Sequence, residues 1–296
     1  MATPRILHMI VPGENVSPFD VNMAADAGFE VIVPYTGITA DKVVALIQDA
    51  IFSRPPKRYR ETGVFIGGWD VNEATEMLSL TRSAMVPPFE VSVFADPNGA
   101  YSTAAAMIAM AEAELIKRDG RGFEGRNTVV FGGGPVGLCA AVLVAKENGN
   151  PMLARLTPAK PEREKAAAGF FDRYDVELPW VSAQTDEGKR SALESAEVVI
   201  TAAKAGIRIL TSDMLEGAEN MKVAVDVNAV PPSGIEGIGP NDAAAALPRG
   251  AVGIGALAVG NVKYKVQSDL LKHMQEADEA VILDFPDAFR RARELL

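Results

Sequence analysis

The segment NTVVFGGGPVGLCAAVLVAKENGN, residues 127–150, constrains the fold of this chain more than any other. A short run of β-branched and aromatic residues meets three glycines, and an apolar helical pattern follows at once. Gly132, Gly134 and Gly137 have G-x-G-x-x-G spacing in the strand–turn–helix context that this motif requires. The segment therefore predicts a dinucleotide-binding turn, with a plain β/α turn as the alternative.

Each glycine of such a turn has its own physical task. The first permits a tight bend, the second lets the backbone approach a pyrophosphate, and the third lets the helix pack closely on the strand. The helix then directs its amino terminus at the anion. The expected cofactor-binding residues of this turn are Gly132, Gly133, Gly134, Pro135, Val136 and Gly137.

The residues after the turn favour NADP over NAD. An NAD site normally carries an Asp or Glu about 20 residues further on, whereas residues 150–161 contain no acid. Arg155 stands near the end of the next predicted strand, where a guanidinium can bind a 2′-phosphate. It is the one basic residue at that point, so NADP is the expected cofactor and NAD stays possible. Arg155 could equally be a surface arginine or stack on the adenine.

Strand-like and helix-like segments alternate along the chain, which predicts an α/β protein with doubly wound parallel sheets. Four β/α pairs precede residue 120, and the pattern restarts at residue 127 after the polar, glycine-rich segment 117–125. We therefore expect two domains with a cleft between them. They are an N-terminal α/β substrate domain, residues 1–118, completed by helices within 270–296, and a Rossmann-like NAD(P)-binding domain, residues 119–269.

Composition excludes several other classes of protein. The chain has 29 basic and 39 acidic residues and a net charge of −10, which argues against a nucleic-acid surface. No apolar run reaches the ~18 residues of a membrane span, and the N-terminus lacks a signal-peptide pattern, so the cytoplasm is the expected compartment. Two histidines and one cysteine predict no metal site. Cys139 lies in the apolar helix and is expected to be a small core residue.

Further candidate residues follow predicted strands, where open α/β sheets bind their ligands. On the cofactor half, small residues in VVITAAKAG suit close approach of the nicotinamide ribose, or else simple helix packing. In VAVDVNAVPP, a polar pair precedes a rigid turn, and its asparagine could equally cap that turn. These cofactor-side candidates are Thr201, Ala202, Ala203, Asp226 and Asn228.

Two N-terminal segments and one C-terminal segment supply candidates for a substrate site. In DPNGAYST, four polar residues stand at a helix entrance, where capping explains one of them. In SPFDVNM, Phe19 and Asp20 suit a flat heterocycle, or serve only capping and packing. Lys263 and Lys265 point to the same face if GIGALAVGNVKYKV is extended, because strands have a period of two; a solvated pair is the alternative. The polar residues at the helix entrance are Asp96, Asn98, Ser102 and Thr103.

Five segments in order, SPFDVNMA, DPNGAYSTAAA, FGGGPVG, DVNAVPPSGIEGI and GIGALAVGNVKYK, resemble the methylene-tetrahydromethanopterin dehydrogenases of methylotrophic bacteria. The resemblance covers nearly the whole chain and is strongest to the branch that uses NAD or NADP. It implies reversible hydride transfer from methylene-tetrahydromethanopterin to NAD(P), giving the methenyl form, in the one-carbon metabolism that oxidises formaldehyde. It also implies a homo-oligomer, a trimer or hexamer.

The same resemblance implies roles for individual residues. Phe19 is similar to the aromatic position that contacts the pterin, Asp20 to a polar anchor, and Lys263 to the active-site lysine, so these three are the expected catalytic residues. Alternatives are a methylene-tetrahydrofolate dehydrogenase, a related pterin reductase, or a non-catalytic NADP-binding sensor, which would need none of the three. The expected substrate-binding residues are Asp96, Asn98, Ser102, Thr103 and Lys265.

Overall fold

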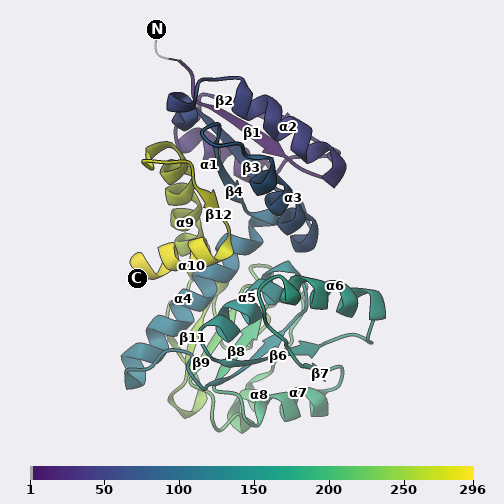
Figure 1. Cartoon of the computed structure of the whole chain (residues 1–296). Coiled ribbons are helices and arrows are strands. Elements are labelled where there is room, and N and C mark those ends of the chain that lie inside the picture. Colours follow the sequence, from purple (N-terminus) through teal and green to yellow (C-terminus); the bar gives the residue numbers. More distant parts are fainter. Residues whose placement is uncertain (1–2) are drawn as a thin grey trace. The chain divides into compact units, whose positions relative to one another are not determined.

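The structure, a computed structural model, describes residues 3–296, which form two compact units (Figure 1). Unit 1 comprises the chain up to Ser102 together with Tyr264–Arg291, and unit 2 comprises Thr103–Lys263 with Ala292–Leu296. The chain passes between them inside two long helices, α4 (Ala100–Asp119) and α9 (Ala256–Glu276), and once more near the end of the shorter helix α10 (Phe285–Glu294). The boundaries that the sequence predicts, after residues 118 and 269, fall in the same two helices.

Unit 1 contains a five-stranded parallel sheet with the strand order β12-β4-β3-β1-β2. The order reverses at β1, which has β2 on one side and β3 on the other. In doubly wound sheets, this reversal opens a crevice at the carboxyl ends of the strands. The strands are β1 (Ile6–Ile10), β2 (Val31–Tyr35), β3 (Thr62–Ile66), β4 (Ser92–Ala95) and β12 (Ile282–Leu283). The helices are α1 (Pro18–Asp26), α2 (Ala40–Phe52), α3 (Val71–Ala84) and α10 (Phe285–Glu294), with short 3-10 turns at Pro56–Glu61 and Pro97–Gly99.

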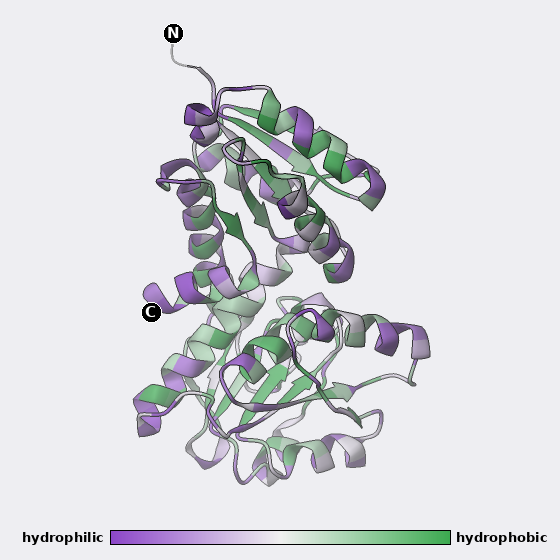
Figure 2. Ribbon diagram, viewed as in Figure 1, coloured by the Kyte–Doolittle hydropathy of each residue, from purple (hydrophilic) through white to green (hydrophobic). Residues whose placement is uncertain are grey.

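The local sequence explains where these elements begin and end. Pro18 occupies the first turn of α1, where its missing N–H costs nothing, and Gly28 turns the chain away with φ +102°. Asp70 caps α3 by accepting hydrogen bonds from the amides of Asn72 and Glu73. Every residue of β3 is buried, as expected for a parallel strand covered on both faces. Figure 2 shows apolar strands inside and polar residues on the outer helices of each unit. No helix within residues 3–296 has the length and hydropathy needed to cross a bilayer.

Unit 2 contains a seven-stranded sheet with the order β10-β11-β9-β8-β5-β6-β7, parallel except for β10. The order reverses at β5, as in dinucleotide-binding Rossmann folds. The predicted α/β fold class is confirmed. The strands are β5 (Asn127–Phe131), β6 (Asn150–Arg155), β7 (Trp180–Ser182), β8 (Val198–Thr201), β9 (Val223–Asp226), β10 (Ala245–Ala246) and β11 (Val252–Ile254). The helices are α5 (Pro135–Lys146), α6 (Pro161–Asp172), α7 (Asp186–Leu193) and α8 (Ser212–Gly217), with a 3-10 turn at Pro248–Gly250.

The segment with the two lysines is helical, so the extended form in which they would share one face does not occur. Lys263 and Lys265 lie in α9, where residues two apart are separated by about 200° around the axis. Lys263 is half-buried and Lys265 is exposed. The short alternation of valine and lysine fits both periods, but Val259, Val262 and Val266 recur at helical spacing. That longer repeat is the signal that decides for a helix.

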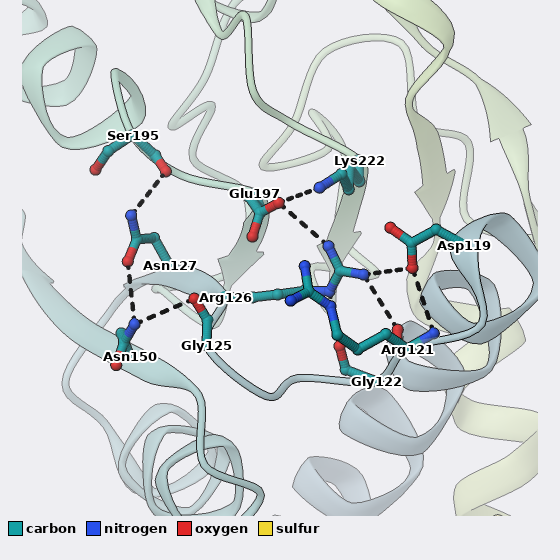
Figure 3. A network of polar contacts seen from close by, with 10 residues as sticks. All are labelled: Asp119, Arg121, Gly122, Gly125, Arg126, Asn127, Asn150, Ser195, Glu197 and Lys222. Atoms are coloured by element: carbon teal, nitrogen blue, oxygen red, sulfur yellow. Dashed lines mark hydrogen bonds and ion pairs between the residues drawn. The ribbon is translucent and has the colours of Figure 1, made fainter.

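A buried arginine ties together the amino ends of three strands in unit 2 (Figure 3). Arg126, just before β5, is fully buried. It donates to Asp119 Oδ1 at 2.5 Å, to Glu197 Oε1 at 3.2 Å and to the carbonyl of Gly122 at 2.7 Å. Glu197, just before β8, also pairs with Lys222, just before β9. The hydrogen bond from Arg126 is the main cause that lowers the pKa of Asp119. A buried guanidinium needs all of these partners, because an unpaired buried charge is strongly destabilising.

Replacing Arg126 by Met should lower the free energy of unfolding of unit 2 by about 3 kcal/mol, because the surrounding carboxylates and carbonyls lose their shared donor. Urea denaturation would measure this through Trp180 fluorescence in a Trp69→Phe background, since the chain has two tryptophans, one in each unit. Lys117→Met is the control, because it removes an exposed pair with Glu114 worth less than about 1 kcal/mol. Equal losses in the two variants would contradict this role of the network.

Candidate functional site

The turn between β5 and α5 is shaped by two glycines that the backbone itself requires. Gly132 has φ +119°, a conformation that disfavours every other residue. A Cβ atom on it would lie 2.5 Å from the carbonyl oxygen of Ala202. A Cβ atom on Gly137 would lie 2.0 Å from the carbonyl oxygen of Gly132. The first helical turn of α5 therefore rests directly on the end of β5.

Gly134 is different, because nothing in the fold requires a glycine there. It is the N-cap of α5, with φ −87°, and a Cβ atom on it would meet nothing within 4 Å. The open space in front of it adjoins the first amides of α5, which have no partner inside the helix. An anion at a helix amino terminus is stabilised by those amides and by the helix dipole. The turn thus fits a pyrophosphate group by its shape and by its donors.

A pocket of about 420 Å³ opens at the carboxyl ends of β5, β6 and β8, where the strand order of unit 2 reverses. Of the residues predicted to bind cofactor, six line it: Gly132, Gly133, Gly134, Arg155, Ala202 and Ala203. The pocket also contains basic residues that sequence reasoning did not assign to the site. Its charged lining residues are Arg155, Lys160, Arg163, Lys204 and Glu164. Four positive charges against one negative charge make it suitable for a phosphorylated ligand despite the acidic chain.

Three other predicted cofactor residues serve the loops behind the pocket. Asp226 is 1% exposed, and its oxygens accept hydrogen bonds from Thr201 Oγ1 at 2.7 Å and from the amide of Gly234 at 2.6 Å. Asn228 Oδ1 accepts from the amide of Gly206 at 3.0 Å. These side chains hold the ends of β8 and β9 in place. Pro135 and Val136 lie half-buried in the first turn of α5, so all five lie outside the pocket lining, and their direct contact with cofactor stays a prediction.

Sequence reasoning missed two residues that surround Arg155. Trp180, from β7, lies over the glycine turn, because a Cβ atom on Gly133 would come within 2.4 Å of its ring. The guanidinium carbon of Arg155 lies 5.7 Å from the centre of that ring. Arg155 Nη1 also pairs with Glu164 Oε1 at 2.5 Å. Strand order brings them together, since β7 is the neighbour of β6 and α6 follows β6. The arginine is thus already engaged on two sides.

Unit 1 has a second pocket, of about 460 Å³, at the carboxyl ends of β1, β3 and β4. It brings together Asp20 and Asn98, two of the residues expected in the substrate site. It also contains Trp69, which is 70% exposed and was not predicted. Gly68 has φ +110° and packs on Pro12, so the turn after β3 presents Trp69 to the pocket. An exposed indole beside polar groups can stack on a flat ring.

Among the other residues predicted for the substrate site, Asp20 lines the pocket, whereas Asp96 and Ser102 stabilise a turn beside it. Asp20 Oδ1 accepts a 2.8 Å hydrogen bond from Gln267 Nε2, which fixes the carboxylate. Buried Asp96 accepts from the amides of Tyr101 and Ser102 and from Ser102 Oγ at 2.5 Å, so both acid and hydroxyl hold the turn that carries Asn98. Their direct contact with substrate stays a prediction.

Three further candidates stand outside the lining of this pocket. Phe19, on α1 beside Asp20, is 45% exposed. Thr103 is half-buried in α4. Lys263 stands on α9 one helical turn before Gln267, the residue that fixes the Asp20 carboxylate. Their assignment to the substrate site rests on the sequence resemblance.

The fold and the glycine turn define a two-unit α/β protein of the dehydrogenase type, with a Rossmann unit shaped for a dinucleotide. Residues 18–98 match the family model for the N-terminal region of methylene-tetrahydromethanopterin dehydrogenase. The chain is 45% identical over 292 residues, 98% of each chain, to the NAD(P)-dependent methylenetetrahydromethanopterin dehydrogenase of Methylorubrum extorquens. The chain belongs to this family, and the resemblance that its motifs indicate is confirmed.

Two more distant similarities agree with this assignment. The bifunctional protein MdtA of Methylorubrum extorquens is 30% identical over 280 residues, 94% of each chain. Among solved structures, shikimate 5-dehydrogenase from Listeria monocytogenes, crystallised with shikimate and NAD, has a TM-score of 0.52 at 11% identity, covering 99% of this chain and 96% of that one. At that identity, the structural match shows only that the fold is shared.

Alanine substitutions at Gly134 and Gly137 should distinguish a glycine that leaves room for the ligand from a glycine that the fold itself requires. Gly134→Ala should leave the free energy of unfolding within about 0.5 kcal/mol, because its Cβ meets nothing. It should weaken NADP⁺ binding at least about tenfold, or ~1.4 kcal/mol, by filling the open space. Gly137→Ala should instead destabilise the nucleotide-free protein by about 2 kcal/mol or more through overpacking. Urea denaturation and isothermal titration calorimetry measure the two effects; unchanged affinity in Gly134→Ala would contradict the pyrophosphate position.

Proposed function

We propose that this chain catalyses reversible hydride transfer from methylene-tetrahydromethanopterin to NAD(P), giving methenyl-tetrahydromethanopterin, in one-carbon metabolism that oxidises formaldehyde. The observation that carries this proposal is the 45% identity over nearly the whole chain to a dehydrogenase named for that reaction. The glycine turn and the basic pocket of unit 2 support the nucleotide half of the reaction. The pocket of unit 1 supports the other half.

The pocket of unit 2 would hold the nucleotide. The turn at Gly132–Gly134 and the amino terminus of α5 would bind its diphosphate, and Ala202 and Ala203 would leave room for the ribose beyond it. Arg155 would bind the adenosine ribose or its 2′-phosphate. A bound nicotinamide ring supplies the acceptor for the hydride, whereas the protein supplies binding and orientation.

The pocket of unit 1 would hold the flat pterin. Trp69 offers an exposed ring face, and Phe19 offers a second aromatic surface on the neighbouring helix. Asp20 and Asn98 would bind the polar edge, where a heterocycle carries donors and acceptors. Because Gln267 fixes the carboxylate of Asp20, this acceptor is held in place before substrate arrives.

The chemistry needs orientation more than a strong base. The reacting carbon lies between two ring nitrogens, so loss of hydride leaves a cation that both nitrogens share. The catalytic requirement is therefore that the reacting carbons approach to about 3–3.5 Å in the right orientation. Asp20 would balance the developing positive charge if its carboxylate faces that carbon instead of the polar edge. Charged Lys263 would oppose it by about 4 kcal/mol at about 4 Å and an effective dielectric of ~20, so we assign Lys263 to a polar edge of the substrate.

The proposed assembly rests only on the resemblance to the family. We propose a homo-oligomer, a trimer or hexamer, and we keep the cytoplasm as the proposed compartment.

A spectrophotometric assay of nucleotide reduction tests the proposed reaction. With methylene-tetrahydromethanopterin, the protein should reduce both NADP⁺ and NAD⁺. Faster turnover with methylene-tetrahydrofolate would instead make it a folate dehydrogenase. Tight nucleotide binding without turnover on either carrier would identify a non-catalytic sensor.

Replacing Lys263 by Ala should lower kcat by about two orders of magnitude, because misplacing a bound substrate costs that much. The dissociation constant for NADP⁺, measured by calorimetry, should change less than about twofold, since this lysine does not line the nucleotide pocket. Lys272→Ala is the matched control, an exposed lysine further along α9. If Lys263→Ala and Lys272→Ala both kept full turnover, the role assigned to Lys263 would be wrong.

A further inference from the structure

The carboxylate of Glu164 stands where the nucleotide pocket has to distinguish NADP from NAD. It lies in the first turn of α6 and is the single acidic residue among those that line the pocket. It pairs with Arg155, the residue at the end of β6 that would meet the adenosine ribose. We infer that Glu164 sets the nucleotide preference of this protein by holding Arg155, so that neither nucleotide is excluded. This inference rests on the proposed use of NAD(P).

The geometry restricts what Arg155 can do alone. Its Nη1 is bound to Glu164 Oε1 at 2.5 Å, and its planar group lies over the ring of Trp180 at 5.7 Å. The side chains of the arginine and the glutamate are 24% and 34% exposed, so the pair is accessible from the pocket. The indole restricts the movement of the guanidinium on one side, and the carboxylate accepts a hydrogen bond from Nη1, one of its two terminal nitrogens. The guanidinium is therefore shared between an internal anion and any phosphate that binds.

NADP and NAD would interact differently with the Arg155–Glu164 pair. A 2′-phosphate has to compete with the Glu164 carboxylate for Arg155 and is repelled by that carboxylate. A ribose 2′-hydroxyl can donate a hydrogen bond to the same carboxylate, as it does to the acid of NAD-specific Rossmann sites. Arg155 thus favours NADP, and Glu164 favours NAD and weakens the advantage of NADP. A pair with both charges is expected to leave both nucleotides usable, whereas a lone charge would select one.

Glu164→Gln removes the charge and keeps the size of the side chain. We expect NADP⁺ to bind about tenfold more tightly, a change of ~1.4 kcal/mol, and NAD⁺ about threefold more weakly. Glu162→Gln is the matched control, because it removes the same charge from the same helical turn, at an exposed residue outside the pocket lining. Arg155→Gln should weaken NADP⁺ by about tenfold or more and change NAD⁺ by less than about threefold.

Isothermal titration calorimetry with NADP⁺ and NAD⁺ measures these affinities without any pterin. Titrations with 2′,5′-ADP and 5′-AMP repeat the comparison on the adenosine half alone. A changed NADP⁺/NAD⁺ affinity ratio in Glu164→Gln, with little change in Glu162→Gln, supports the inference. An unchanged ratio, or an equal shift in both variants, overturns it. The proposed reaction fails separately, if the unmodified protein binds both nucleotides yet turns over no methylene-tetrahydropterin.

Discussion

The close contact between Gly137 and the carbonyl of Gly132 is the constraint on which the nucleotide pocket depends. With 2.0 Å between that oxygen and any Cβ on Gly137, no other residue lets α5 begin so close to the end of β5. That start aims the first amides of α5 along the carboxyl edge of the sheet. It also leaves the space before Gly134 empty. Two glycines thus build the turn, and the third leaves room for what the turn binds.

Both units apply the same topological rule to different ligands. Each sheet reverses its strand order next to its first strand, and each has its pocket at the carboxyl ends of the strands around that reversal. The lining then differs as the two ligands would require. The pocket of unit 2 has backbone amides and four basic side chains, which suit phosphates. The pocket of unit 1 has an exposed indole, an amide and a fixed carboxylate, which suit a flat ring with polar edges. Hydride transfer between a nucleotide and a pterin needs one pocket of each kind.

The parts of this structure that short-range patterns determine could be predicted from the sequence. Alternating periods predicted four β/α pairs before residue 120 and a restart at residue 127, as the structure has them, and the glycine spacing located the turn. Contacts that depend on strand order could not be predicted. Trp180 reaches Arg155 because β7 lies beside β6, and no local pattern near residue 155 indicates that neighbour. Glu164 reaches Arg155 from α6, the helix that follows β6, through the path of the connecting loop, which the sequence pattern does not specify. The two-residue strand β12 is too short to show a period of two, and it joins the sheet through β4, far away in the sequence. The valine–lysine alternation at residues 262–266 could not distinguish a strand from a helix, because so few residues fit both periods.

Buried acids at strand ends are residues whose role the sequence pattern alone does not predict. Their hydrogen bonds also explain how the loops after these strands are held. Asp96 and Asp226 each stand at or just after the end of a strand, two residues before an asparagine. Both looked like ligand contacts, yet each is nearly fully buried and accepts hydrogen bonds from backbone amides and from a nearby hydroxyl. A carboxylate so placed is stabilised only when its acceptor sites are filled, so it fixes the loop that it belongs to. In unit 1 that loop gives Asn98 its left-handed conformation, with φ +49°, and places it at the pocket. In unit 1 the acid of the motif therefore fixes the loop that places Asn98 at the pocket, and direct contact of either residue with a ligand stays a prediction.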